Sequence, residues 1–179
     1  MSSIINYILR MIPYMIGIIP IFMVIRMIFY KLNKKSKVNL KREVLMLMFL
    51  MFITGLYSQA ITGDFSIKNI NLGKINVVPF KIFIDTYKEV FIRKNINYFI
   101  ISFLGNIGMF IPVGLLIPII WKVNDKTVIL VGFFISLSIE LSQLFLNRGT
   151  DIDDLIFNTL GTIIGLLIYK IISKGKKKA

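Results

Sequence analysis

Apolar residues occur along this chain in long blocks that are separated by short polar connectors. The blocks show neither strand alternation nor an amphipathic pattern, and each approaches the ~20 residues that a helix needs to cross ~30 Å of hydrocarbon. The pattern therefore predicts an all-α, polytopic transmembrane helical bundle of about five spans, in one integral membrane domain over residues 1–179. The predicted spans are Met11–Tyr30, Val44–Ile61, Tyr98–Trp121, Thr127–Asn147 and Leu155–Ile172.

The long connector Gly63–Asn97 carries two structural signals of its own. Its stretch "INVVPF" (Ile75–Phe80) is extended in character, because a residue before proline is pushed toward β or polyproline II geometry. The following "KIFIDTYKEVFIRK" places its apolar side chains close to one helical face, with basic residues as the charged complement. This pattern predicts an interfacial helix that lies on anionic headgroups, and a solvated loop is the alternative.

The distribution of basic residues predicts the orientation. The chain has 22 Lys and Arg against 9 Asp and Glu, a formal net charge of +13. Thirteen of the basic residues fall in Lys31–Arg42, in Lys122–Lys126 and from Lys170 onward, and seven fall in the loops on the opposite side. The positive-inside rule therefore predicts an N-terminus outside and a C-terminus in the cytoplasm. Because the charge lies where topology signals belong, we expect no nucleic-acid partner.

The absence of two residue types narrows the possible chemistry. The chain contains no cysteine and no histidine, which excludes disulfides, thiol nucleophiles and the usual general base. Any reaction must therefore use carboxylates, hydroxyls, amides, lysine or arginine. The sequence assigns no metal site and identifies no cofactor.

Polar residues inside the predicted spans are the main functional signal. On the fourth span, one helical face carries Ser136, Glu140, Gln143 and Asn147 at spacings of 4, 3 and 4. If the span ends at Asn147, Glu140 lies ~10 Å below its outer end. A charged carboxylate at that depth costs about 2.5–3.5 kcal/mol on insertion scales, so Glu140 must face protein or trapped water.

Two further spans repeat this theme. The third span carries Asn106 at a similar depth, and the fifth opens with Asp151, Asp154 and Asn158 on one face, followed by a GxxxG motif at Gly161. These stripes predict one water-accessible pocket in the outer third of the bilayer. Its predicted members are Asn106, Glu140, Gln143, Arg148, Asp151, Asp154 and Asn158.

Structural roles are open for the same residues. Asp151 and Asp154 precede or open a helix, where acids satisfy free N–H groups. Glu140 is also a candidate ion-pair partner of Arg148, which would be a structural role and not a catalytic one. The asparagines are candidate interhelical contacts, and the GxxxG motif is typical of helix packing.

Four motifs also resemble a known family. "NVVPF", "GNIGMFIPVGLLIP", "SIELSQLF" and "RGTDIDDLIFNTLGTIIGLLIY", in this order within residues 71–169, are similar to the VanZ-like family of small bacterial membrane proteins. The resemblance implies a VanZ-like core at 71–169, a multi-pass location in the bacterial cell membrane and a link to resistance against teicoplanin-type lipoglycopeptides. It also adds Asp153 as a family-pattern position. The predicted site comprises the catalytic candidates Glu140, Arg148, Asp151 and Asp154 and the substrate-binding candidates Asn106, Gln143, Asp153 and Asn158.

Three functional hypotheses follow. The first is a protein of the Gram-positive cell envelope that acts at the outer leaflet. Its partners are membrane lipids and a lipoglycopeptide or a lipid-linked wall precursor. The second is an intramembrane hydrolase or transferase acting on a lipid headgroup, in which Arg148 holds a phosphate, Glu140 serves as acid or base, and Asp151 with Asp154 holds Mg²⁺. The third is a small transporter or assembly partner. The sequence gives no oligomeric state and does not decide whether the protein is an enzyme.

Overall fold

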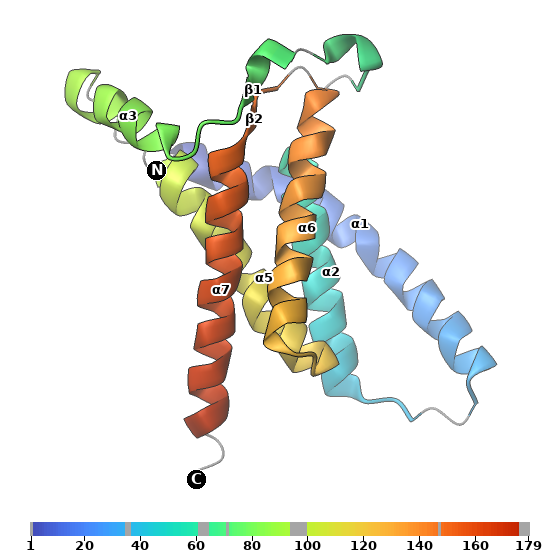
Figure 1. Cartoon of the computed structure of the whole chain (residues 1–179). Helices are drawn as coiled ribbons and strands as arrows, with labels where there is room; N and C mark the ends of the chain where they lie inside the picture. The colour runs from blue at the N-terminus through green and yellow to red at the C-terminus, as the bar shows by residue number, and fades with distance from the viewer. Residues whose placement is uncertain are drawn as a thin grey trace. The chain divides into compact units, whose positions relative to one another are not determined.

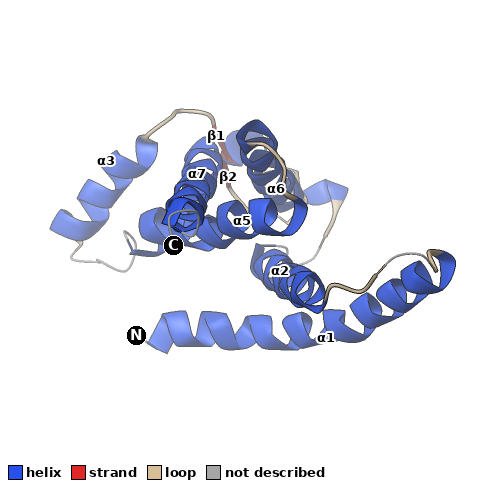
Figure 2. Cartoon of the chain, turned by 90° about the horizontal axis from the view of Figure 1, so that it is seen from below, coloured by secondary structure: helices blue, strands red, loops and turns tan. Residues whose placement is uncertain are grey.

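The computed structural model describes residues 2–34, 37–60, 65–70, 72–93, 100–146 and 148–175. The chain forms two compact units, Met1–Thr62 and Gly63–Ala179. Helices make up nearly all of the described chain, and strand is confined there to one short pair (Figure 2). The predicted all-α class is confirmed. The prediction of one integral membrane domain over residues 1–179 stays a prediction.

The first unit is a pair of helices, α1 (Ser2–Leu32) and α2 (Leu40–Ala60), which pack against each other. Gly55 of α2 lies against the side chains of Met11 and Met15 of α1, so a Cβ at this position would meet both. Most apolar side chains of α1 are exposed, with Met27 at 67%. Such a surface is suited to lipid, because hydrocarbon solvates it as well as a protein core would.

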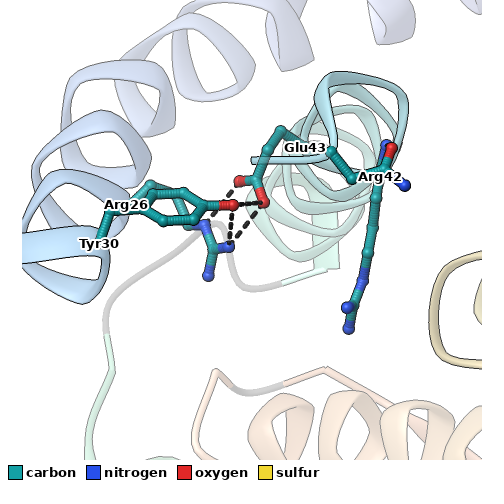
Figure 3. Close-up of polar contacts among 5 residues, drawn as sticks. Arg26, Tyr30, Arg42 and Glu43 are labelled. Atoms are coloured by element: carbon teal, nitrogen blue, oxygen red, sulfur yellow. Dashed lines mark hydrogen bonds and ion pairs between the residues drawn. The ribbon is translucent and has the colours of Figure 1, made fainter. Parts of the chain in front are cut away.

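One polar cluster joins the two helices of this unit (Figure 3). Arg26 of α1 donates two hydrogen bonds of 2.6 Å to the carboxylate of Glu43 in the first turn of α2. The hydroxyl of Tyr30, one turn after Arg26, donates a third at 2.8 Å. This bidentate geometry is the strong form of an arginine–carboxylate pair. It gives Arg26, which lies within the predicted span Met11–Tyr30, a specific partner.

The substitution Glu43→Gln is expected to lower the free energy of unfolding by about 1–2 kcal/mol, because it removes one charge-assisted acceptor. The hydrogen bond from Arg26 lowers the pKa of Glu43 below its ordinary value of 4.5. The stabilisation is therefore complete above pH 4.5 and is lost as the pH falls through the lowered pKa. Denaturant titrations of the purified chain in micelles, at neutral and at acid pH, would check this. A difference between wild type and variant that persists at acid pH would contradict it.

Three helices build the bundle of the second unit: α5 (Asn106–Trp121), α6 (Asp125–Leu144), which runs opposite to the other two, and α7 (Ile152–Gly175) (Figure 1). They run side by side, with α7 packed against both α5 and α6 (Figure 1). Asn124 caps the start of α6, where its side-chain oxygen accepts a hydrogen bond from the amide of Thr127. Because α6 and α7 run in opposite directions, the end of α6 and the start of α7 lie at the same end of the bundle (Figure 1).

Glycines allow α5 and α7 to approach closely. A Cβ added at Gly161 would fall on the carbonyl oxygen of Ile107, and one at Gly165 on that of Ile111. In the opposite direction, a Cβ at Gly114 would fall on the carbonyl oxygen of Thr162. Backbone therefore contacts backbone along this interface, as expected for a GxxxG motif.

Hydropathy identifies four described helices that are long and apolar enough to cross a membrane: Leu9–Leu32, Phe103–Trp121, Asp125–Leu144 and Ile152–Gly175. They correspond to the first, third, fourth and fifth predicted spans. The second predicted span forms the helix α2, which is not among these four. The membrane-type helical bundle is confirmed, and the number of five spans stays a prediction.

The fourth span ends earlier than predicted. Helix α6 stops at Leu144, because the chain then turns and the carbonyl of Gln143 accepts hydrogen bonds from the amides of Leu146 and Arg148. Glu140 therefore lies about 6 Å from the helix end at 1.5 Å per residue, and the predicted ~10 Å is wrong. Asn147, the last member of the predicted stripe, lies outside the described residues.

Candidate functional site

The turn between α6 and α7 is joined to the long outer segment by a short parallel strand pair. β1 (Ile75–Asn76) pairs with β2 (Thr150–Asp151), as Figure 1 shows. The side chain of Asn76 adds a hydrogen bond of 2.8 Å from its Nδ2 to Oδ1 of Asp151. The extended geometry predicted for the "INVVPF" stretch is confirmed at β1. This pairing brings residues about 75 positions apart in sequence to one place.

Asp153 fixes the next part of the outer segment. Its side chain is fully buried, and its two carboxylate oxygens accept hydrogen bonds from the backbone amides of Phe80 and Ile82. These amides open the helix α3 (Lys81–Tyr87), whose preceding residue Phe80 makes no side-chain cap. Asp153 thus supplies a capping carboxylate from another element, at the positive end of the helix dipole. It also holds Phe80 in its left-handed conformation, with φ of 62°.

Aromatic side chains also attach α3 to the bundle. The ring of Phe83 lies 5.7 Å from that of Phe103 and 6.2 Å from that of Phe157 in α7. Phe103 and Phe157 meet edge to face at 4.8 Å. Such pairs contribute about 0.5–1.5 kcal/mol each beyond their area burial. The predicted helix after "NVVPF" is confirmed, since α3 and its π-helical continuation Lys88–Ile92 span this stretch.

Glu140 holds the α6–α7 turn. Its Oε2 accepts a hydrogen bond of 3.0 Å from the amide of Asp151, and its carbonyl accepts one of 3.1 Å from the hydroxyl of Thr150. The residue is 3% exposed. Asp151 in turn accepts a hydrogen bond of 2.9 Å from the amide of Asp153. Glu140 of α6 therefore fixes the backbone of Asp151, and the Asp151 carboxylate fixes the backbone of Asp153.

Two asparagines connect the bundle helices. Asn106 of α5 donates from Nδ2 to Oδ1 of Asp154 on α7. One turn further along α7, Asn158 donates to the hydroxyl of Ser136 on α6 at 2.9 Å, and both residues are buried. Oδ1 of Asn158 has no hydrogen-bond partner among the described residues. The polar stripes of all three helices thus face each other, as their spacing predicts.

A charged cleft of about 310 Å³ opens where the outer segment meets the turn. Its charged members are two lysines from the outer segment and three aspartates. Of the eight predicted site residues, only Asp151 and Asp154 line it. The lining comprises Lys74, Asn76, Lys81, Ile82, Asp85, Gly149, Thr150, Asp151 and Asp154.

The other six predicted site residues lie outside this lining. Glu140, Asp153 and Asn158 are buried, and Asn106 donates a hydrogen bond to Asp154. Gln143 is partly exposed near the end of α6, and Arg148 is exposed in the turn. Their predicted catalytic and binding roles stay predictions.

None of the lining residues from the outer segment was predicted as a site residue: Lys74, Asn76, Lys81, Ile82 and Asp85. Their only signal is position, because they lie in or close to the "NVVPF" motif (Asn76–Phe80) that the family resemblance singles out. Of these residues, the sequence predicted only Lys81 as part of the basic complement of an interfacial helix, in contact with headgroups. Among the described residues, no group of three or more acidic side chains is arranged to hold a metal ion.

Fold and site together define a polytopic helical membrane protein with a charged cleft at one end of its bundle. The family model described as VanZ/LLP1 matches residues 18–173, and the chain therefore belongs to the VanZ/LLP1 family. The match begins well before residues 71–169, whose motifs carry the resemblance. A search of curated proteins and a search of solved structures each returned no match.

Proposed function

We propose that this VanZ/LLP1 protein acts at the outer leaflet of the bacterial cell membrane, where it lowers susceptibility to teicoplanin-type lipoglycopeptides. The observation that carries the proposal is the charged cleft at one end of the α5–α6–α7 bundle. The opposite end of the bundle carries Lys122, Lys126 and Lys174. The positive-inside rule favours that lysine-rich end in the cytoplasm, and hence the cleft on the outside.

The outer segment beside the cleft suits the membrane surface. Helix α3 and its continuation expose Ile84, Tyr87 and Phe91 at 58–71% of their surface, next to several lysines. Apolar side chains with a basic complement are the composition of an interfacial helix. An interfacial helix beside the cleft brings the cleft to the level of the headgroups. Its ligand is therefore a membrane lipid, the lipid anchor region of the drug or a lipid-linked wall precursor, held without catalysis.

A lipid-modifying hydrolase or transferase is the second candidate, and one observation favours it. Asp154 lines the cleft, and the hydrogen bond from Asn106 fixes its orientation. A positioned carboxylate beside a bound headgroup is the arrangement that general acid–base catalysis requires. Glu140 does not line the cleft and acts in this scheme through the turn that it holds.

Expression of the wild type in a susceptible Gram-positive host is expected to raise resistance to teicoplanin more than to vancomycin. The variant Asp154→Asn should lose the effect, because it replaces one carboxylate of the cleft by a neutral amide of the same size. Lys126→Gln, at the opposite end of the bundle, is the matched control and should keep it. Minimal inhibitory concentrations at equal membrane abundance would measure this.

Mass spectrometry of extracted lipids and wall precursors separates the two candidates. A lipid species that appears with the wild type and disappears in Asp154→Asn supports the enzyme. Resistance without any new species supports binding alone. Resistance that Asp154→Asn retains in full would contradict a role for the cleft in either form.

A further inference from the structure

The cleft carries opposite charges on two different walls. Its ammonium groups, from Lys74 and Lys81, belong to the outer segment. The α6–α7 turn and the start of α7 contribute the carboxylates of Asp151 and Asp154. A ligand bound between these walls meets two ammonium groups and the Asp85 carboxylate on one side, and the carboxylates of Asp151 and Asp154 on the other. A purely anionic or purely cationic group would be opposed by one wall.

The two carboxylates on the turn side are held in place through one oxygen each. Oδ1 of Asp151 accepts hydrogen bonds from Asn76 and from the amide of Asp153, at 2.8 and 2.9 Å. Oδ1 of Asp154 accepts from Asn106. Among the described residues, nothing donates a hydrogen bond to the second oxygen of either carboxylate. Each aspartate is therefore oriented and keeps acceptor capacity for a ligand.

The opposite wall offers charges that are not consumed by each other. Lys81 and Asp85 are four residues apart on α3, on one helical face, and both line the cleft. Neither is in an ion pair within 4.0 Å among the described residues. A lysine that precedes an aspartate at this spacing has the less favourable orientation for pairing. The two groups thus stay available to a ligand.

Exposed apolar side chains surround this wall. Val77, Val78 and Phe80 precede Lys81, and Ile84 follows it, each at 54–69% exposure. A ligand with a charged head and an apolar body would contact both kinds of surface at once. This continuity favours a lipid over a small soluble molecule.

We propose that the cleft binds the headgroup of a phospholipid that carries both a phosphate and a primary ammonium. The phosphate lies against Lys81 and Lys74, the ammonium donates hydrogen bonds to Asp151, Asp154 and Asp85, and the acyl chains lie along the apolar residues of the outer segment. A quaternary ammonium cannot donate these hydrogen bonds, and a glycerol headgroup lacks the cation. The inference rests on the proposed outer-leaflet location of the cleft and names the ligand class of that site.

Native mass spectrometry of the full-length chain in micelles provides the test, with short-chain phosphatidylethanolamine, phosphatidylcholine, phosphatidylglycerol and free phosphoethanolamine as probes. Phosphatidylethanolamine is expected to bind about tenfold more tightly than any of the other three probes. Lys81→Gln and Asp85→Asn should each weaken its binding about tenfold. Lys81 is exposed and Asp85 is half-buried, and both lie on α3 outside the α5–α6–α7 bundle, so neither change should disturb the bundle. Lys126→Gln serves as the control.

Three results would overturn the inference. Equal binding of phosphatidylglycerol or phosphatidylcholine would remove the requirement for a primary ammonium. Equal binding of free phosphoethanolamine would show that the apolar surroundings contribute nothing and that the ligand is not a lipid. Binding unchanged in Lys81→Gln and Asp85→Asn would place the lipid elsewhere. If headgroup preference fails while resistance still depends on Asp154, this inference falls and the proposed function stands; the reverse pattern retains the ligand class and removes the link to resistance.

Discussion

The substitution Gly161→Ala is expected to destabilise the second unit by about 3 kcal/mol, the upper part of the range for overpacked cores. The new Cβ would occupy the place of the Ile107 carbonyl oxygen, and backbone cannot move aside as a flexible side chain can. The sign is informative, because glycine to alanine in an ordinary helix interior stabilises by about 1 kcal/mol. Separating α5 from α7 would also break the hydrogen bond between Asn106 and Asp154.

Gly108→Ala is the matched control for this substitution. Gly108 lies in α5, the helix against which Gly161 of α7 packs, but a Cβ at Gly108 meets nothing within 4 Å. This variant should therefore be as stable as the wild type or more so. Unfolding by sodium dodecyl sulfate in mixed micelles, followed by circular dichroism, measures both variants. Equal stability of the two would contradict backbone contact between α5 and α7.

The substitution Asp153→Ala is expected to cost about 3 kcal/mol, because it leaves one buried and one partly buried backbone donor without their charged acceptor. The effect should be local to the outer segment. The amides of Phe80 and Ile82 donate to this carboxylate and would exchange their hydrogens much faster in the variant. The strand pair β1–β2 and the aromatic contacts of Phe83 should keep the segment attached to the bundle.

Hydrogen exchange by mass spectrometry, resolved to the peptides around α3, would detect this change. Asp85→Ala is the control, since its carboxylate lies on the same segment but is not bonded to these amides. Asp153→Asn should give an intermediate result, because an amide side chain supplies one acceptor oxygen where the carboxylate supplies two. Unchanged exchange in Asp153→Ala would contradict the capping role.

Much of the fold could be predicted because hydrophobicity decides it. Long apolar blocks become helices in a membrane, since no other open structure satisfies the backbone there. The GxxxG motif at Gly161 predicts close packing, and the structure confirms it against α5. The spacing of Asn106 and Asp154 predicts that polar faces meet, and these two side chains are hydrogen bonded.

The remaining parts of the fold and of the site depend on contacts that no sequence pattern indicates. The donors to Asp153 are backbone amides more than 70 positions away, and any residue type carries such an amide. The end of α6 was placed too late because Phe145 and Leu146 are apolar and continue the hydropathy of the span into the turn. Lys81 and Asp85 belong to the cleft because β1 pairs with β2 and Asp153 binds the start of α3.

Cysteine labelling in intact cells tests most directly whether the cleft lies on the outer side of the membrane. The chain has no native cysteine, so Gly149→Cys and Lys174→Cys each introduce a single thiol. A Cβ at Gly149 makes only an ordinary contact of 3.5 Å with the carbonyl oxygen of Lys74, so this variant should fold. An impermeant maleimide should label position 149 in intact cells and position 174 only after permeabilisation. Labelling of position 174 but not of position 149 in intact cells would place the cleft in the cytoplasm and contradict its role at the outer leaflet.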